Sequence, residues 1–172
     1  DCVEGKYKSA IGQTSAEQCV NCLAGKYKGV TGQDEENDCE DCVAGKFKND
    51  TGQTGQDEAQ QCINCEAGTY SSTVAASSAD TCIDCVAGKY SDTEAASSEA
   101  SCIDCGAGKY SGTEAASSEA ICISCGPGKY MTVAGQTLDG HCIDCDAGTY
   151  SSRLAAYSAD TCIDCVAGKY KS

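Results

Sequence analysis

The cysteines are the most reactive side chains of this sequence, and all but one of them occur in C-x-x-C doublets. The chain has 172 residues, of which 17 are Cys, and the doublets recur every 20 residues except across one interval of 23. Thiols at this density can form disulfides, bind zinc as thiolates or exchange electrons. The doublets are Cys19/Cys22, Cys39/Cys42, Cys62/Cys65, Cys82/Cys85, Cys102/Cys105, Cys122/Cys125, Cys142/Cys145 and Cys162/Cys165, and Cys2 is the second half of another.

The spacing of the doublets also falls within the range of four-Cys zinc sites. Zinc sites built from neighbouring doublets would create two kinds of spacer, one inside each site and one between sites. Here all spacers are equivalent apart from the single longer interval. A redox C-x-x-C motif would need an α/β scaffold, which the sequence does not predict. The pattern therefore favours disulfides without a metal site, and a zinc array is an alternative.

Two regular disulfide schemes fit the doublets, because sequence alone does not fix connectivity. In one, adjacent doublets interlock, as in Cys19–Cys39 with Cys22–Cys42, which leaves Cys2 over and creates a 40-residue period. In the other, which we call the sequential scheme, all repeats are alike and Cys165 is left unpaired. The 20-residue period favours the sequential scheme. Its pairs are Cys2–Cys19, Cys22–Cys39, Cys42–Cys62, Cys65–Cys82, Cys85–Cys102, Cys105–Cys122, Cys125–Cys142 and Cys145–Cys162.

Each repeat begins with the motif C-x-x-G-[KT]-[YF]. About ten polar residues follow, and the repeat then ends, in most cases, with the motif C-[IV]-[DN]. The Gly fits a backbone position with positive φ or a close approach to a sulfur, and the Asp or Asn fits a turn. Both ends of the repeat suit short extended strands. We expect the aromatic residue to pack on the neighbouring disulfide and Gly. These aromatics are Tyr7, Tyr27, Phe47, Tyr70, Tyr90, Tyr110, Tyr130, Tyr150 and Tyr170.

We predict one continuous tandem array over residues 1–172, cut from a longer chain and ending in a truncated repeat. The middle of each repeat, such as 93–100, is expected to be a loop, since so short a closed segment has little room for a stable isolated helix. The predicted fold class is small disulfide-rich repeats, forming an elongated solenoid or rod of single-disulfide loops with short β-hairpins and little helix. The repeats begin at Cys2, Cys22, Cys42, Cys65, Cys85, Cys105, Cys125, Cys145 and Cys165.

Composition excludes several classes of protein. Ile, Leu, Val and Phe account for only 20 residues, too few for a large apolar core, so cross-links must supply most of the stability. The net charge of −14 argues against nucleic-acid binding, and no apolar run is long enough to span a membrane. His141 is the only His, and no acid–base cluster is evident, so we expect neither enzymatic activity nor a catalytic residue.

The motif C-x-x-G-K-Y at the head of a single-disulfide loop resembles the cysteine-rich modules of tumour-necrosis-factor receptors. It resembles more closely the ephrin-receptor-like repeats found in long extracellular proteins of algae and other protists. The resemblance extends over the whole chain and is carried by Cys, Gly, Tyr and the doublet spacing. Family members often have Pro after the second Cys, whereas Pro127 is the sole Pro here. The resemblance implies an elongated ladder of disulfide loops, supports the sequential scheme and implies no catalytic residue.

Acidic and hydroxyl side chains could bind ions or carry glycans. The run 34–38 and the doublet aspartates (Asp84, Asp104, Asp144 and Asp164) could hold Ca²⁺ only weakly, because no EF-hand-like loop is present, and we expect turns and solvated charge instead. Asn49 begins an N-glycosylation sequon in the longest repeat. O-glycosylation, with ordinary solvation as the alternative, is a hypothesis for Ser77, Ser78, Ser97, Ser98, Ser117 and Ser118.

These features predict a structural extracellular protein of the cell surface, namely a stiff rod, stalk or filament such as a flagellar-hair-like fibre. Assembly with copies of itself and glycosylation are expected. The alternative is a receptor-type ectodomain that binds a protein ligand, which needs exposed aromatic or Arg anchors. Only Arg153, Leu154 and Tyr157 depart from the repeat in this way.

Overall fold

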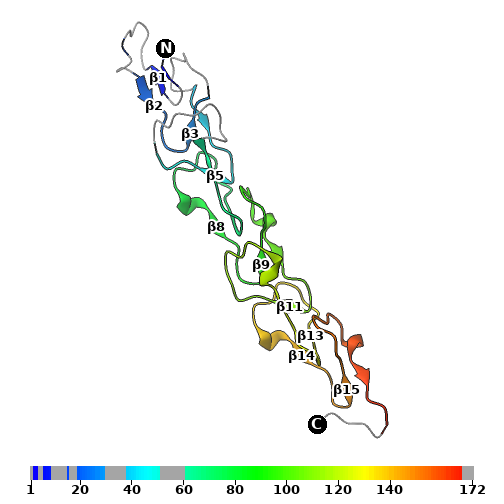
Figure 1. Cartoon of the computed structure of the whole chain (residues 1–172). Helices are drawn as coiled ribbons and strands as arrows, with labels where there is room; N and C mark the ends of the chain where they lie inside the picture. The colour runs from blue at the N-terminus through cyan, green and yellow to red at the C-terminus, as the bar shows by residue number, and fades with distance from the viewer. Residues whose placement is uncertain are drawn as a thin grey trace. The chain divides into compact units, whose positions relative to one another are not determined.

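The computed structural model of the chain describes residues 2–3, 6–8, 15, 19–29, 38–50 and 61–167. The repeated sequence folds into two-stranded antiparallel hairpins that follow one another along the chain (Figure 1). The paired strands are β1 (Lys6–Lys8) with β2 (Cys19–Asn21), β3 (Lys26–Tyr27) with β4 (Glu40–Asp41), β5 (Lys46–Phe47) with β6 (Ile63–Asn64), β7 (Thr69–Tyr70) with β8 (Ile83–Asp84), β9 (Lys89–Tyr90) with β10 (Ile103–Asp104), β11 (Lys109–Tyr110) with β12 (Ile123–Ser124), β13 (Lys129–Tyr130) with β14 (Ile143–Asp144), and β15 (Thr149–Tyr150) with β16 (Ile163–Asp164).

From β3 to β15, the first strand of each hairpin begins at a glycine turn. In the C-x-x-G motif the residue after Gly donates a backbone hydrogen bond three residues back, as from Lys46 to Val43 at 3.2 Å. The Gly itself has positive φ, from +78° at Gly128 to +91° at Gly68, which a side chain would disfavour. The positive φ predicted for this position is therefore confirmed.

The second strand of each later hairpin follows one turn of 3-10 helix. These turns are η3 (Ala79–Thr81), η4 (Glu99–Ser101), η5 (Glu119–Ile121), η6 (Asp139–His141) and η7 (Ala159–Thr161). In η3 the Ser78 hydroxyl accepts a hydrogen bond from the Asp80 amide, and the Cys82 amide donates to the Ala79 carbonyl at 2.9 Å. The middle of the repeat is thus a loop with a single helical turn, as expected from its length.

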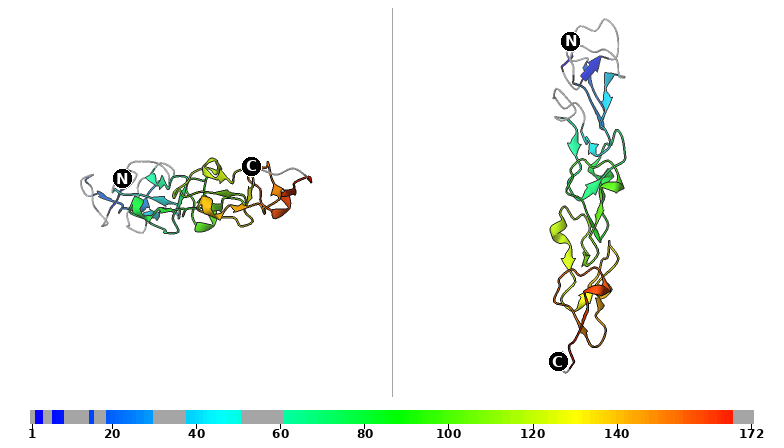
Figure 2. Two further views of the ribbon diagram at one scale, coloured as in Figure 1. Left: turned by 90° about the horizontal axis from the view of Figure 1, so that it is seen from below. Right: turned by 90° about the vertical axis from the view of Figure 1, so that its right-hand side faces the viewer.

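The chain divides into two compact parts, Asp1–Ile83 with Thr93–Ser101, and Asp84–Asp92 with Cys102–Ser172. In each part the ribbon consists of short strands and loops rather than layered sheets (Figure 2). A small cluster in the first part contains Phe47, Cys65 and Ala76, with Cys82 packed against it. A cluster in the second part contains Cys125, Met131 and Cys142, with Tyr110 packed against it. Each is one disulfide with a few neighbours, so the predicted class of small disulfide-rich repeats is confirmed.

The described segments contain no helix that is long and apolar enough to cross a membrane.

Candidate functional site: the disulfide ladder and the repeat junctions

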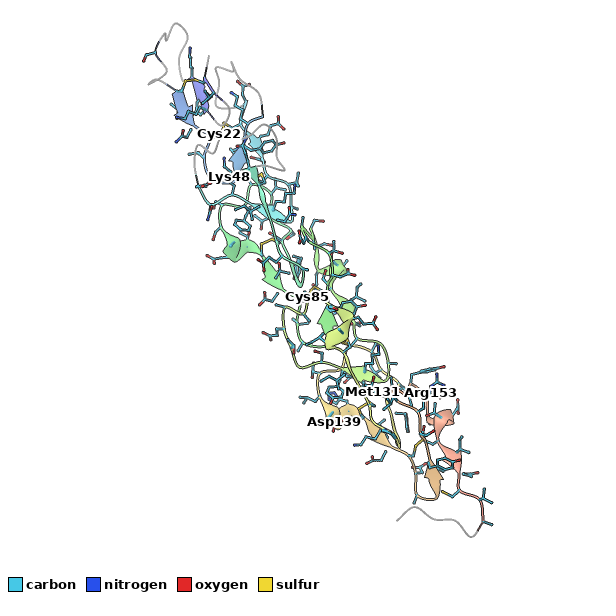
Figure 3. All side chains as sticks on the ribbon, in the orientation of Figure 1. Cys22, Lys48, Cys85, Met131, Asp139 and Arg153 are labelled. Carbon is cyan, nitrogen blue, oxygen red and sulfur yellow. A yellow bond between two sulfur atoms is a disulfide. The ribbon has the colours of Figure 1, made fainter. Side chains whose placement is uncertain are left out.

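Eight disulfides join the second Cys of each doublet to the first Cys of the next, which is the arrangement of the sequential scheme (Figure 3). Seven of them close a sequence separation of 17, and Cys42–Cys62 closes one of 20 because its loop carries three extra residues. Cys165 is the free cysteine of the described segments and is half-buried. Sulfurs joined in disulfides cannot serve as zinc-binding thiolates.

No group of three or more His, Cys, Asp or Glu side chains within the described ranges is placed to hold a metal ion. Residues 34–37 of the acidic run lie outside these ranges. Doublet aspartates instead pair with the Lys opposite on the hairpin, as in Lys89–Asp104 at 3.0 Å and Lys129–Asp144 at 3.6 Å. At these two positions the aspartate therefore takes part in a cross-strand ion pair in addition to its expected place before the second Cys.

Consecutive repeats are joined by the same two backbone hydrogen bonds at each of the five junctions from the Cys42 repeat to the Cys145 repeat. At one of them the Ser91 amide donates to the Ala116 carbonyl, and the Ala115 amide donates back to the Cys85 carbonyl, both at 2.9 Å. Because these bonds use only main-chain atoms, they do not depend on which side chains the two repeats carry. The junction can therefore be reproduced in every repeat.

The loop residue that donates the second of these bonds has a left-handed backbone. Its φ is +54° at Ala75, +52° at Ala95, +51° at Ala115, +71° at Gly135 and +50° at Ala155. Alanine in this region costs about 1–2 kcal/mol relative to an ordinary conformation. Four repeats have an alanine in this unfavourable conformation. The hydrogen bonds of the junction, and not the local sequence, therefore impose the loop geometry.

The same loop also reaches the repeat two positions earlier in the chain. A Cβ atom on Gly108 would lie 2.3 Å from the Ala155 carbonyl oxygen, and one on Gly45 would lie 2.1 Å from that of Ala95. The close approach that the sequence predicted at this Gly is therefore to a backbone carbonyl and not to a sulfur. Three repeats meet at such a point, and only glycine leaves room for it.

The residue six positions after the Cys that begins a repeat, which we call the junction residue, is buried in the seven repeats from Cys22 to Cys145, whereas the equivalent Lys8 of the first repeat is half-buried. In those seven repeats its exposure is 6% or less. Sequence reasoning missed this position, because its side chain changes between repeats and carries no consistent hydrophobic signal. The junction residues are Lys28, Lys48, Ser71, Ser91, Ser111, Met131 and Ser151.

Lys48 is a fully buried junction residue with polar partners. Its Nζ donates to the Lys26 carbonyl at 2.7 Å and to Gln61 Oε1 at 3.4 Å, and the Gln61 amide in turn donates to the Lys28 carbonyl at 3.0 Å. Burial lowers the pKa of Lys48, and the negative charge of Asp50 partly opposes this shift. This junction holds a charge where four others hold a serine hydroxyl.

The aromatic residues are less uniformly packed than expected. Phe47 is 9% exposed and packs with Cys65 of the next disulfide, and Tyr110 packs on the cluster that contains Cys125 and Cys142. Tyr150, in contrast, is 44% exposed. The expected packing on a neighbouring disulfide is therefore correct at the first two positions and wrong for Tyr150.

Candidate glycosylation sites differ in accessibility. Asn49 is exposed, whereas Thr51 of its sequon lies outside the described residues. The Ser78 and Ser118 hydroxyls accept hydrogen bonds from the amides at the start of a 3-10 turn. The candidates that are exposed and have no such capping bond among the described contacts are Ser77, Ser97, Ser98 and Ser117.

One loop presents large side chains to solvent. The Arg153 guanidinium carbon lies 5.4 Å from the centre of the Tyr157 ring, and Leu154 between them is 62% exposed. Tyr157 is 56% exposed, in agreement with its departure from the repeat.

Residues 52–102 match the protein family described as tyrosine-protein kinase ephrin type A/B receptor-like. The matched stretch contains two complete disulfide loops, Cys65–Cys82 and Cys85–Cys102. Among curated proteins, none matches the chain significantly. Dense disulfides and repeats of this kind are typical of extracellular domains.

Proposed function

We propose that this chain, whose residues 52–102 match the ephrin-receptor-like family, is a structural protein of the cell surface, built as a stiff rod, stalk or filament. Its repeats require no catalytic group and bind each other through main-chain atoms. Copies associate into a fibre, and glycans cover part of its surface. The protein is not an enzyme in this proposal.

The observation that carries this proposal is the recurrence of the same two hydrogen bonds at the five junctions described. In repeat proteins whose units contact only near neighbours, length increases by adding units without enlarging a core. Each disulfide stabilises its own loop by about 3 kcal/mol through the unfolded state. These two features support a protein selected for length and durability.

Small-angle X-ray scattering of the oxidised, full chain tests the rod. A compact protein of this length would have a radius of gyration of about 16 Å. We expect a clearly larger value together with about one free thiol among the 17 cysteines after denaturation without reductant. A radius of gyration near the compact value would contradict the rod. A count of 17 free thiols would instead favour the alternative interpretation, a zinc array.

Glycosylation is tested on chain secreted from a eukaryotic host. We expect peptide N-glycosidase to reduce the mass of the chain, and Asn49→Gln to abolish this change. Asn64→Gln, at an exposed Asn without a sequon, is the matched control. An unchanged mass in the untreated and treated chain would remove the N-glycan from the proposal.

The second candidate is a receptor-type ectodomain, and the observation that favours it is the exposed group of Arg153, Leu154 and Tyr157. Electron microscopy of native material separates the two, since a structural protein should appear as fibres and a receptor as isolated particles. Fibres labelled along their length by an antibody to this chain would support the structural role.

A further inference from the structure

The loop of the Cys145 repeat keeps the backbone of its relatives. The amide of Arg153 donates to Ser151 Oγ at 3.3 Å, as the amide of Thr73 donates to Ser71 Oγ at 3.3 Å. Ser158 caps η7 in the same way as Ser78 caps η3. The fold of this loop therefore does not explain why its outward side chains differ.

Three exposed side chains in that loop are larger than their counterparts in the Cys65 repeat. Arg153, Leu154 and Tyr157 stand where the Cys65 repeat has Thr73, Val74 and Ser77, as the repeat alignment shows. We call these three residues the Arg153 platform, and Figure 3 shows Arg153 extending from the edge of the ribbon.

The Arg153 platform has the residue types of a binding site, and its Arg side chain is held in place before a partner binds. Arg and Tyr are the residue types that dominate binding energy at protein interfaces. The guanidinium, 5.4 Å from the Tyr157 ring centre, is held by a cation–π contact, which limits the side-chain entropy lost on binding. The described residues provide no ion pair to Arg153. Its donors can therefore engage a carboxylate from outside.

The chain itself offers a fitting carboxylate. Glu114, which corresponds in the Cys105 repeat to Leu154, is exposed and is flanked by small residues, Thr113 and Ala115. The corresponding Glu94 already accepts a hydrogen bond from Asn64 at 3.3 Å. A second copy is complementary to Arg153, because each chain carries 26 Asp and Glu against 12 Lys and Arg and so offers acidic loops to a cation.

We propose that the Arg153 platform binds the Glu114 loop, residues 112–118, of a second copy of this chain. The two surfaces differ, so the contact can repeat head-to-tail along a filament unless the rotation between copies closes it into a two-fold dimer or a ring. This inference rests on the proposed self-assembly and assigns it a contact.

Sedimentation velocity of the oxidised full chain over a concentration series tests the contact. We expect association that weakens with added salt, because it includes an exposed ion pair. Arg153→Thr with Leu154→Val and Tyr157→Ser gives this loop the outward residues of the Cys65 repeat. This triple variant should raise the dissociation constant at least about 30-fold, the loss expected for a hot spot. The matched control replaces Thr73, Val74 and Ser77 by Ala and should associate like the wild type.

A charge exchange makes the test specific. Arg153→Glu and Glu114→Arg chains should each fail to associate alone, and an equal mixture should associate again, because each mixed contact has opposite charges. Free-thiol counts equal to that of the wild type verify that the variants are folded.

Association that is unchanged by the triple variant would overturn this contact while leaving the filament proposal intact. A chain that stays monomeric at every concentration would overturn the contact and the proposed self-assembly together. Platform-dependent binding to an unrelated protein by a monomeric chain would overturn both in favour of the receptor.

Discussion

Lys48 illustrates how a charged side chain occupies a position that the fold buries. The corresponding residue is a small Ser in four described repeats and Met131 in another. The ammonium group remains in place because the Lys26 carbonyl and Gln61 accept its hydrogen bonds. Gln61 therefore belongs functionally to the junction, although it lies outside the C-x-x-G motif.

We expect the contribution of Lys48 to the stability of the chain to rise with pH as the ordinary Lys pKa of 10.5 is approached from below. Burial lowers the pKa of Lys48 in the folded state, so the unfolded chain binds more protons in this range, and raising the pH favours folding. Lys48→Met should flatten this dependence in denaturant titrations. Cys165 is alkylated beforehand so that its thiolate cannot exchange disulfides. An equal slope in both proteins would contradict the assignment.

The reciprocal change, Met131→Lys, should lower the unfolding free energy by about 3 kcal/mol, because it buries a charge without matched acceptors. The residue equivalent to Gln61 in this repeat is His141. Its side chain is exposed, so we do not expect it to accept a hydrogen bond from the buried ammonium group as Gln61 does. Met131→Leu, which keeps an apolar side chain of similar volume, is the control and should cost under about 1.5 kcal/mol. Equal losses for Lys and Leu would argue that packing alone matters at this position.

The left-handed alanines give a second prediction at the residue scale. Ala115→Gly removes strain at φ +51° and should raise the unfolding free energy by about 0.5–1 kcal/mol, after the greater freedom of Gly in the unfolded chain is subtracted. Gly135→Ala should do the opposite, since its Cβ would lie 2.9 Å from Asp104 Oδ1. Ala116→Gly, at a neighbouring buried position outside the left-handed set, should destabilise. Chemical denaturation of the oxidised variants gives all three values.

At the scale of the element, the hairpin and the loop have different tasks. The hairpin places a half-exposed Ile opposite an aromatic, as Ile103 opposite Tyr90, and contributes little buried area. The loop makes the hydrogen bonds to the preceding repeat and the contact with the Gly of the repeat before it. Order along the array therefore depends more on the loops than on the strands.

Gly108→Ala should open the junction that its repeat forms with the Ala155 loop. The new Cβ would meet the Ala155 carbonyl oxygen at 2.3 Å, and φ is +85°, so both overpacking and backbone strain act, with a total of about 3 kcal/mol. The Ala155 amide should lose protection from hydrogen exchange. Gly106→Ala, two residues earlier, has open space around its Cβ and should leave exchange unchanged. Similar exchange in the two variants would contradict a junction at Gly108.

Sequence reasoning reached the features that recur with a constant residue type. The disulfide loops, the hairpins and the positive φ after the doublet follow from Cys, Gly and Tyr at one spacing. It missed the burial of the junction residue, because Ser, Lys and Met differ in polarity and therefore give no common sequence signal. It also missed the left-handed loop residue where that residue is Ala, although Gly135 and its sequence equivalents Gly12, Gly32 and Gly52 carried the signal. The last three lie outside the described residues.

At the scale of the whole molecule, charge is sorted by position within the repeat. Every Lys of the chain stands four or six residues after the Cys that begins a repeat, and in the described repeats these positions lie in the hairpin or at the junction. The loops therefore carry most of the uncompensated acidic charge. Repulsion between acidic loops opposes a contact between copies wherever two such loops face each other. Arg153 is the one cation placed on a loop, which is why a contact between copies is expected there.

Removing one disulfide should destabilise the array locally. If repeats contact only their neighbours and next neighbours, replacing Cys105 and Cys122 by Ser removes about 3 kcal/mol from one loop and weakens the junctions around it. Hydrogen exchange should then speed up at the Ala115 and Gly135 amides, which donate across the two junctions of this repeat. The Ala75 amide, bonded to Cys42 in the other compact part, should keep its protection.

A second double variant replaces Cys145 and Cys162 by Ser instead. Hydrogen exchange should then stay slow at the Ala115 amide and speed up at the Ala155 amide. If either double variant lost protection everywhere at once, the chain would be one cooperative domain, and the argument that length can grow by adding repeats would fail.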